Sequence, residues 1–224
     1  MERSIWNQPW FLIPVLLFYV LALVVTLWAP YGYELIWFNP HRVEPWNTFF
    51  IWATRLGEAP LWVAAAVILL FVHRPYGIVL ITALLLMAPI SYVAKDLIGI
   101  PRPNTWFDLH QLQDLLVKVP GVPLNGGNTS FPSGHTMLAF TMFSLVALML
   151  PGRWRHLGAL LALLAWLTGV SRIFLVQHFL RDILAGAAFG LAISSLVWFG
   201  YNRWLNKKKD TVSDNPSSST STNE

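Results

Sequence analysis

The segment SRIFLVQHFLRD, residues 171–182, places two arginines, a histidine and a carboxylate at the junction of two long apolar runs. These runs, residues 157–176 and 183–201, each approach the roughly 20 residues that a helix needs to cross a bilayer. His178 and Asp182 are four residues apart, so on a helix they would be neighbours on one face. Ionisable side chains beside membrane spans usually have a function. The segment therefore predicts a helical membrane protein with a chemical site between its last two spans.

The rest of the chain is mostly apolar. Of 224 residues, 55% are hydrophobic and 12% charged, against about 25% charged in soluble domains. We expect an all-α fold, a bundle of six transmembrane helices at residues 10–29, 60–72, 78–93, 136–150, 157–176 and 183–201. The second span requires a helix that begins near Thr54, and residues 31–56 before it read as loop plus interfacial helix. Residues 1–205 would form one transmembrane domain, and residues 206–224 a disordered cytoplasmic tail.

Lys95 and Arg102 form a second polar cluster, at the end of the third predicted span. They are seven residues apart, so a continuous helix would put both on one stripe. Prolines at positions 101 and 103 would instead bend the chain and swing Arg102 inward. Both side chains suit phosphate oxygens, and the alternative is a pair of cations that snorkel at a helix end.

The third cluster is SFPSGH, residues 130–135, at the start of the fourth predicted span. Ser133 can cap the helix and Gly134 allows close approach to the backbone, so the free N–H groups would bind an anion. His135 would lie beside that anion as a proton donor. The alternative is an ordinary helix cap followed by an interfacial histidine.

The pair His178 and Asp182 also has a chemical logic of its own. A carboxylate can bind one ring nitrogen, fix the tautomer and leave the other nitrogen free as a nucleophile or base. Arg172 would add a phosphate contact, and the alternative is a structural histidine–aspartate pair.

Charge and composition also exclude several classes of protein. The absence of cysteine removes disulfides, thiolate catalysis and cysteine-ligated metals. The net charge of +4 comes largely from Arg203 and residues 207–209, directly after the last apolar run. This pattern favours a membrane-surface anchor over nucleic-acid binding.

An even number of spans puts both termini on one side and all three clusters on the other. Without the cations of the clusters, eight lysines and arginines fall on the side of the termini and three on the opposite side. The positive-inside rule then predicts cytoplasmic termini and clusters at the outer face.

Taken together, the clusters resemble the signature of the type 2 phosphatidic acid phosphatase (PAP2) superfamily, in its bacterial membrane lipid phosphatase branch. The resemblance covers about residues 50–200 and rests on Lys95-x6-Arg102-Pro103, Pro132-Ser133-Gly134-His135 and Ser171-Arg172-x5-His178-x3-Asp182. It implies a PAP2/haloperoxidase-like core. One departure is Val176, where many relatives have glycine.

The resemblance also implies roles for these residues. His178 would be the nucleophile that forms a phosphohistidine, Asp182 would orient it, and His135 would protonate the leaving group. The phosphate-binding residues would be Lys95, Arg102, Ser133, Gly134 and Arg172. No metal and no cofactor is expected.

The leading hypothesis is a metal-independent hydrolase of a lipid phosphomonoester or diphosphate in a bacterial-type inner membrane. Candidate substrates are phosphatidylglycerophosphate, phosphatidic acid, undecaprenyl diphosphate and lipid A phosphates. The alternatives are a lipid-to-lipid phosphotransferase with the same site and a non-catalytic lipid-headgroup binder or transporter. The expected partners are the lipid substrate and the bilayer, with neither nucleic acid nor a protein partner. The sequence assigns no role to Arg181 or to the loop at residues 104–128.

Overall fold

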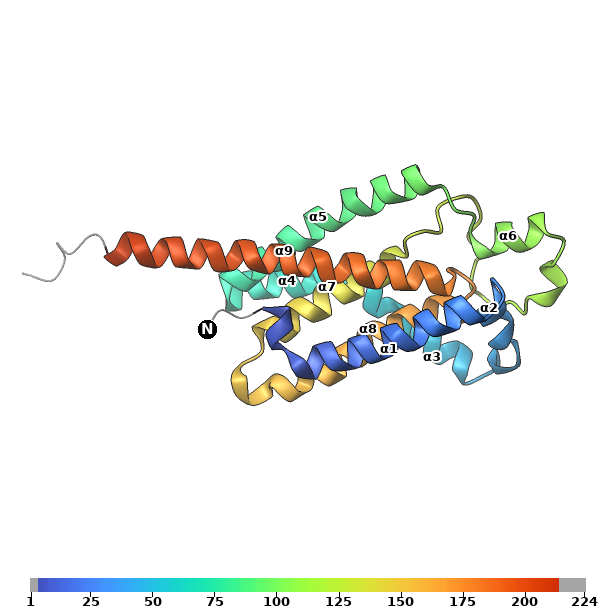
Figure 1. Cartoon of the computed structure of the whole chain (residues 1–224), viewed down its shortest axis with the longest axis horizontal. Helices are drawn as coiled ribbons and strands as arrows, with labels where there is room; N and C mark the ends of the chain where they lie inside the picture. The colour runs from blue at the N-terminus through green and yellow to red at the C-terminus, as the bar shows by residue number, and fades with distance from the viewer. Residues whose placement is uncertain (1–3, 214–224) are drawn as a thin grey trace, which may run out of the picture.

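The chain folds into a bundle of long helices that lie side by side, with the last helix running the length of the molecule (Figure 1). The computed structural model describes the backbone of residues 4–213 and the side chains of residues 4–208. Within that range every regular element is a helix. The predicted all-α fold is therefore confirmed.

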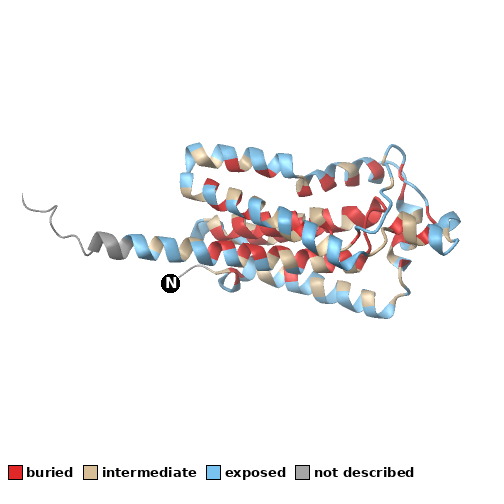
Figure 2. Ribbon diagram, turned by 90° about the horizontal axis from the view of Figure 1, so that it is seen from above, coloured by how far each residue is buried: buried red, intermediate tan, exposed pale blue. Residues whose placement is uncertain are grey.

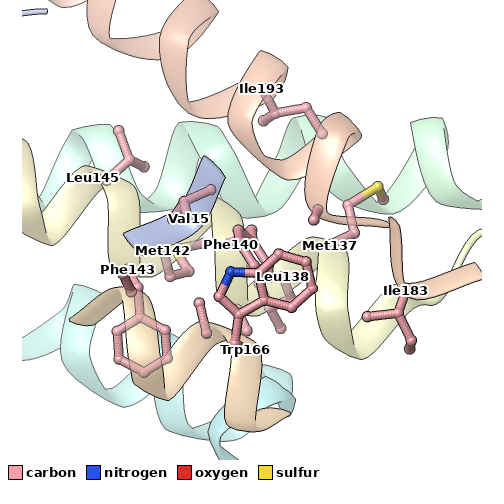
Figure 3. Packing of buried hydrophobic residues seen from close by; sticks show 14 of the residues in the cluster. Val15, Met137, Leu138, Phe140, Met142, Phe143, Leu145, Trp166, Ile183 and Ile193 are labelled. Atoms are coloured by element: carbon pink, nitrogen blue, oxygen red, sulfur yellow. The ribbon is translucent and has the colours of Figure 1, made fainter. Parts of the chain in front are cut away.

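Helix α7 (Gly134–Met149) is the centre of the bundle. It packs against α8 (Gly158–Phe174) and α9 (Leu180–Ser213), and nearly all its side chains are buried. Phe140 of α7 meets Trp166 of α8 edge-on, with ring centroids 5.0 Å apart (Figure 3). In Figure 2 the buried residues gather on these inner helices.

Two glycines of α9 allow it to contact the backbone of α7 directly. A Cβ at Gly186 would lie 2.7 Å from the carbonyl oxygen of Ser133, and one at Gly190 2.7 Å from that of Met137. Small residues four apart permit this close approach between membrane helices. As a result the first turns of α7 and α9 lie side by side, and the N–H of Ser133 donates to the carbonyl of Asp182 at 3.0 Å.

The outer helices expose apolar side chains, which is typical of helices that face lipid. They are α1 (Pro9–Trp28) and the antiparallel pair α4 (Ala59–Val72) and α5 (Arg74–Ile98). Exposed examples are Leu27, Phe71 and Leu97. Shorter elements connect the long helices: α2 (Tyr33–Trp37), α3 (Trp46–Ala53), α6 (Pro103–Leu109) and the 3-10 turns η1 (Ile5–Asn7), η2 (Asn39–His41), η3 (Thr54–Gly57), η4 (Gln113–Leu115) and η5 (Gly152–Leu157).

Six spans are not confirmed in the described residues. Four helices, α1, α5, α8 and α9, are long and apolar enough to cross a membrane. A fifth span exists if the segment Trp46–Gly57 and α4, which meet at a bend of 49°, count as one. The predicted span at residues 136–150 corresponds to α7, which has 16 residues. This helix is enclosed by other helices rather than facing lipid.

The end of α9 differs from the predicted domain boundary. The helix continues through Ser213, so residues 206–213 are helical although we expected a disordered tail from residue 206. No glycine or proline interrupts residues 201–213, and lysine favours helix. The rest of the expected tail, residues 214–224, lies outside the described residues.

Candidate active site

His178 and Asp182 meet at the turn between α8 and α9. The chain leaves α8 at Phe174 and enters α9 at Leu180, so His178 precedes the helix. Its Nδ1 lies 3.5 Å from Oδ2 of Asp182. The two residues are therefore in contact as predicted, but the interpretation that both share a helical face is wrong, because Asp182 reaches back from the first turn of α9.

Val176 explains how the chain makes this turn. Its φ is 57°, in the left-handed region where glycine is favoured and a β-branched residue is unusual. This is the departure from the PAP2 resemblance noted above. The valine adopts a backbone conformation that favours glycine, at a cost of order 1–3 kcal/mol.

The carboxylate of Asp182 is held from several directions. Its Oδ2 accepts hydrogen bonds from Oγ of Ser130 at 2.5 Å and from the N–H of Phe179 at 2.9 Å. The second contact is the reciprocal half of a helix cap, in which a residue of the first turn binds the N–H that precedes the helix. Because Ser130 and Asp182 are both fully buried, the orientation of the carboxylate toward His178 is fixed.

Burial decides the charge of His178. Desolvation lowers the pKa of the imidazole to about 4, although the nearby carboxylate of Asp182 favours the protonated form. The ring is therefore neutral at pH 7. Since Nδ1 faces Asp182, Nε2 is the nitrogen left to react.

The third predicted cluster, residues 130–135, leads into the start of α7, as expected. Ser133 is its N-cap, and Oγ accepts from the N–H of Thr136 at 3.4 Å. A Cβ on Gly134 would lie 4.0 Å from Nζ of Lys95, so Lys95 of α5 lies beside the positive end of the α7 dipole. His135 follows, half-buried, within electrostatic range of Lys95 and His178.

The two arginines complete the arrangement. Nη1 of Arg172 donates to Oγ1 of Thr54 at 2.7 Å, while its buried Nε has no hydrogen-bond partner. Arg102 lies in extended backbone before α6, and its Nη1 is 3.5 Å from the carbonyl oxygen of Gln177. The bent chain, not the continuous helical stripe, is therefore the correct alternative for Arg102.

All eight predicted site residues thus lie around one point at the end of the bundle. Positive side chains and the N-terminus of α7 surround a neutral imidazole, and His135 experiences Arg172, His178, Lys95 and Arg102 electrostatically. This set can bind a phosphate group, since arginine, lysine and a helix N-terminus all favour it.

The sequence did not identify the residues that support this set. Arg42 donates from Nε to the carbonyl of Phe174 at 2.7 Å and from Nη2 to that of Ile173 at 3.4 Å, at the end of α8. Gln177 accepts from Asn125 at 2.6 Å and so ties the loop at residues 104–128 to the turn. In the sequence, the only indication was an arginine within the aromatic segment 31–56. Its role at the end of α8 is visible only from its long-range contacts in the structure.

Comparison with known proteins agrees with this arrangement. The sequence model of the PAP2 superfamily matches residues 72–205. Lipid phosphate phosphatase 2 of Arabidopsis thaliana is 27% identical over 183 residues, 69% of this chain and 62% of the relative. Lipid A 1-phosphatase of Rhizobium etli is 30% identical over 129 residues, 57% of this chain and 51% of the relative. The chain therefore spans less than two thirds of the length of these relatives.

A solved structure has the same fold. The transmembrane PAP2 type phosphatidylglycerolphosphate phosphatase from Bacillus subtilis superposes with a TM-score of 0.60 at 24% identity, over 86% of this chain and 96% of that one. The family match itself covers more than half of the sequence and includes all three clusters. The chain therefore belongs to the PAP2 superfamily.

Proposed function

We propose that this protein is a multi-pass membrane lipid phosphatase that hydrolyses a phosphomonoester or diphosphate through a phosphohistidine. One observation carries the proposal: a buried, neutral His178, oriented by Asp182, lies among three cations and the N-terminus of α7. A neutral imidazole with one nitrogen oriented by a carboxylate is an activated nucleophile.

In the first step Nε2 of His178 attacks phosphorus, an N–P bond forms and the bond from phosphorus to the leaving oxygen breaks. His135 donates a proton to that oxygen, and the bound phosphate dianion favours the protonated ring that this requires. Lys95, Arg102 and Arg172 stabilise the charge on the other phosphoryl oxygens.

In the second step water attacks the phosphohistidine. His135, now neutral, accepts a proton from this water, the N–P bond breaks, and the electron pair returns to His178. Inorganic phosphate leaves. Because side-chain cations neutralise the phosphoryl charge, we expect the reaction to need no metal ion or cofactor.

An apolar groove beside the site supports a lipid substrate. It has a volume of about 480 Å³ and lies between α5 and α9, lined by side chains that include Pro89, Ala94 and Phe189. Ala94 is the neighbour of Lys95, and in Figure 1 this half of α5 runs away from α9. We assign the groove to the acyl or isoprenoid chain of the substrate.

The experiment is phosphate release by the detergent-purified protein from phosphatidylglycerophosphate, phosphatidic acid, undecaprenyl diphosphate and lipid A. We expect turnover that persists in the presence of a chelator and is lost in His178→Ala. Binding of these lipids without turnover would instead favour a headgroup binder or transporter.

Hydrolysis and phosphotransfer share the first step and separate in the second. With labelled donor and an unlabelled acceptor lipid, hydrolysis predicts label in inorganic phosphate alone. Label on the acceptor would identify a phosphotransferase. Trapping the labelled protein in alkali, where phosphohistidine survives, tests the intermediate in either case.

We also propose an inner-membrane location with cytoplasmic termini and the site at the outer face, since cations outside the site favour the terminal side. The chain has no cysteine, so one introduced thiol reports one position. Lys118→Cys should react with an impermeant maleimide in intact cells, and Gly152→Cys only after permeabilisation. The reverse pattern would invert the topology.

A further inference from the structure

Asp182 has one satisfied oxygen and one that lacks a hydrogen bond. Oδ2 is bound by Ser130 and Phe179 and faces His178. Oδ1 is buried and has no hydrogen-bond partner. A buried polar atom without a hydrogen-bond partner costs free energy, so a cation beside this oxygen would stabilise it.

Arg181 supplies a cation at this oxygen. Its Nε lies 4.0 Å from Oδ1 of Asp182, and that Nε is likewise buried without a hydrogen-bond partner. The guanidinium lies over the ring of Tyr31, 4.0 Å from its centroid, and 5.7 Å from the centroid of Phe179. Stacking of this kind fixes the direction of an arginine side chain.

The position of Arg181 is behind the pair rather than in the phosphate site. With Tyr31, Glu34 and Leu180 it lines a narrow cleft between the end of α1 and the start of α9. Oε1 of Glu34 accepts the N–H of Leu180 at 2.8 Å and so holds the first turn of α9 there. The phosphate-binding arginines near His178 are Arg172 and Arg102, which come from other elements.

We propose that Arg181 is a positioning residue, stacked on Tyr31, that lies against the free oxygen of Asp182 and thereby keeps the carboxylate directed at His178. Tyr31 and Glu34 precede the residues that match the family, 72–205. Residues 31–34, from the loop after α1 to the start of α2, would thus form a rear support for the reactive pair, contributed by this chain's own N-terminal part. The activity readout of this inference rests on the proposed phosphohistidine chemistry.

The charged groups around the pair give the sign of the effect. His178 interacts with Asp182 of α9, Arg172 of α8, His135 of α7 and Arg102 before α6. Lys95 of α5 and Arg102 interact with Asp182. Arg181 in turn faces Asp182, Tyr31 and Glu34. Loss of the Arg181 cation removes positive charge from the rear of the pair, so we expect His178 to take up its proton at higher pH.

The test compares Arg181→Gln, Arg181→Lys and wild type by steady-state kinetics over pH. For Arg181→Gln we expect kcat to fall about 10- to 100-fold because the pair is misdirected. KM should stay unchanged, and the acid limb of kcat/KM should move to higher pH. Arg181→Lys keeps the charge and should restore part of kcat. A raised KM with unchanged kcat would overturn the proposal, because it would make Arg181 a substrate contact.

Tyr31 offers a matched pair of variants that isolates the stacking. Its hydroxyl is buried without a hydrogen-bond partner, so Tyr31→Phe should leave kcat at the wild-type level. Tyr31→Leu removes the ring and should also lower kcat, but by less than Arg181→Gln does. Equal activity of the Phe and Leu variants would contradict the role of the ring.

A control and a second readout separate this inference from the proposed function. Arg203 lies over the ring of Phe199 at 5.2 Å on the far part of the same helix, so Arg203→Gln removes a comparable contact and should change nothing. In ¹⁵N-histidine NMR of the purified protein, Arg181→Gln should raise the pH at which His178 protonates, whether or not a lipid is hydrolysed. An unchanged titration in protein that melts at the wild-type temperature would refute the positioning role. If wild type releases no phosphate but the titration shifts, the proposed function fails and the positioning role stands.

Discussion

Lysine and arginine gather at both ends of the bundle, and the two ends hold them differently. At the site, Arg172 is only 7% exposed, and its guanidinium is anchored on Thr54. At the opposite end, Arg203 and Lys207 are exposed to the surroundings. A buried cation costs free energy until an opposite charge compensates it, whereas an exposed cation is already solvated. The same residue types therefore indicate an anion-binding site at one end and a polar surface at the other.

Cavity size alone would have selected the wrong end. A groove of about 670 Å³ lies between α5 and α9 at the opposite end, lined by side chains that include Arg74 and Trp204. It is larger than the groove of about 480 Å³ beside Lys95. Neither groove has a histidine or a carboxylate in its lining. What separates them is position, because the smaller groove is lined by Ala94, the chain neighbour of Lys95.

The largest loss of activity should come from replacing a buried cation at the site end. In the proposed mechanism Arg172→Ala removes a cation that stabilises the phosphoryl oxygens, and we expect kcat/KM to fall about 10³-fold. Phosphate release from the best lipid substrate measures this. Thr54→Val keeps the arginine but removes the hydrogen bond that anchors it. We expect kcat/KM of this variant to fall only about tenfold, since a misdirected charge still acts at short range. Equal losses in both variants would contradict a direct phosphate contact by Arg172.

The pH profile tests the environment of His178. Burial holds the pKa of the imidazole near 4, so the acid limb of kcat/KM, where this ring becomes protonated in the free enzyme, should lie near pH 4. Asp182 favours the protonated ring, so Asp182→Asn should move this limb to lower pH while reducing kcat. The free energy of unfolding should also decline between about pH 6.5 and pH 4, because the unfolded chain takes up the proton first. An acid limb centred at pH 6.5 would show that His178 is solvated.

Local sequence patterns predicted the short-range contacts of the candidate site. Ser133 caps α7 and Asp182 meets His178 because both relations span four residues or fewer. Arg102 was left between two alternatives, since the proline-rich bend alone does not say where the side chain ends. Its contact with Gln177 bridges 75 residues, which only the packed bundle determines.

The predictions for residues 136–150 and 31–56 that the structure corrects failed for one physical reason, which is that long-range packing decides them. The predicted span at residues 136–150 is apolar, yet as α7 it faces other helices and not lipid, and apolarity does not separate the two environments. Arg42 and Glu34 were assigned to an interfacial segment, but each reaches the end of another helix across more than 100 residues. Such contacts leave no local pattern in the sequence.

A moderate effect on stability should come from replacing Arg42, which is buried at the site end and has hydrogen-bond partners for its guanidinium. Its guanidinium is bound by the carbonyls of Phe174 and Ile173 and by Asn39. Arg42→Met removes these hydrogen bonds and leaves the end of α8 without its cation, so we expect a loss of about 2 kcal/mol in the free energy of unfolding. Thermal unfolding in detergent measures it. Arg55, exposed and stacked at 4.0 Å on Trp52, is the control, and Arg55→Met should change stability by less than about 0.5 kcal/mol.

The smallest effect should come from the opposite end. Arg203 and Lys208 lie over the rings of Phe199 and Trp204, at 5.2 Å and 5.7 Å, and exposed contacts of this kind are worth about 0.5–1 kcal/mol. The double variant Arg203→Gln and Lys208→Gln should therefore keep kcat/KM within about twofold in neutral detergent, because an exposed charge far from the site is screened. In vesicles, its binding to anionic lipid should weaken while turnover per bound enzyme stays constant. A tenfold loss of turnover in detergent would mean that the exposed end also acts on the substrate, and the contrast between buried and exposed cations would no longer separate binding site from surface.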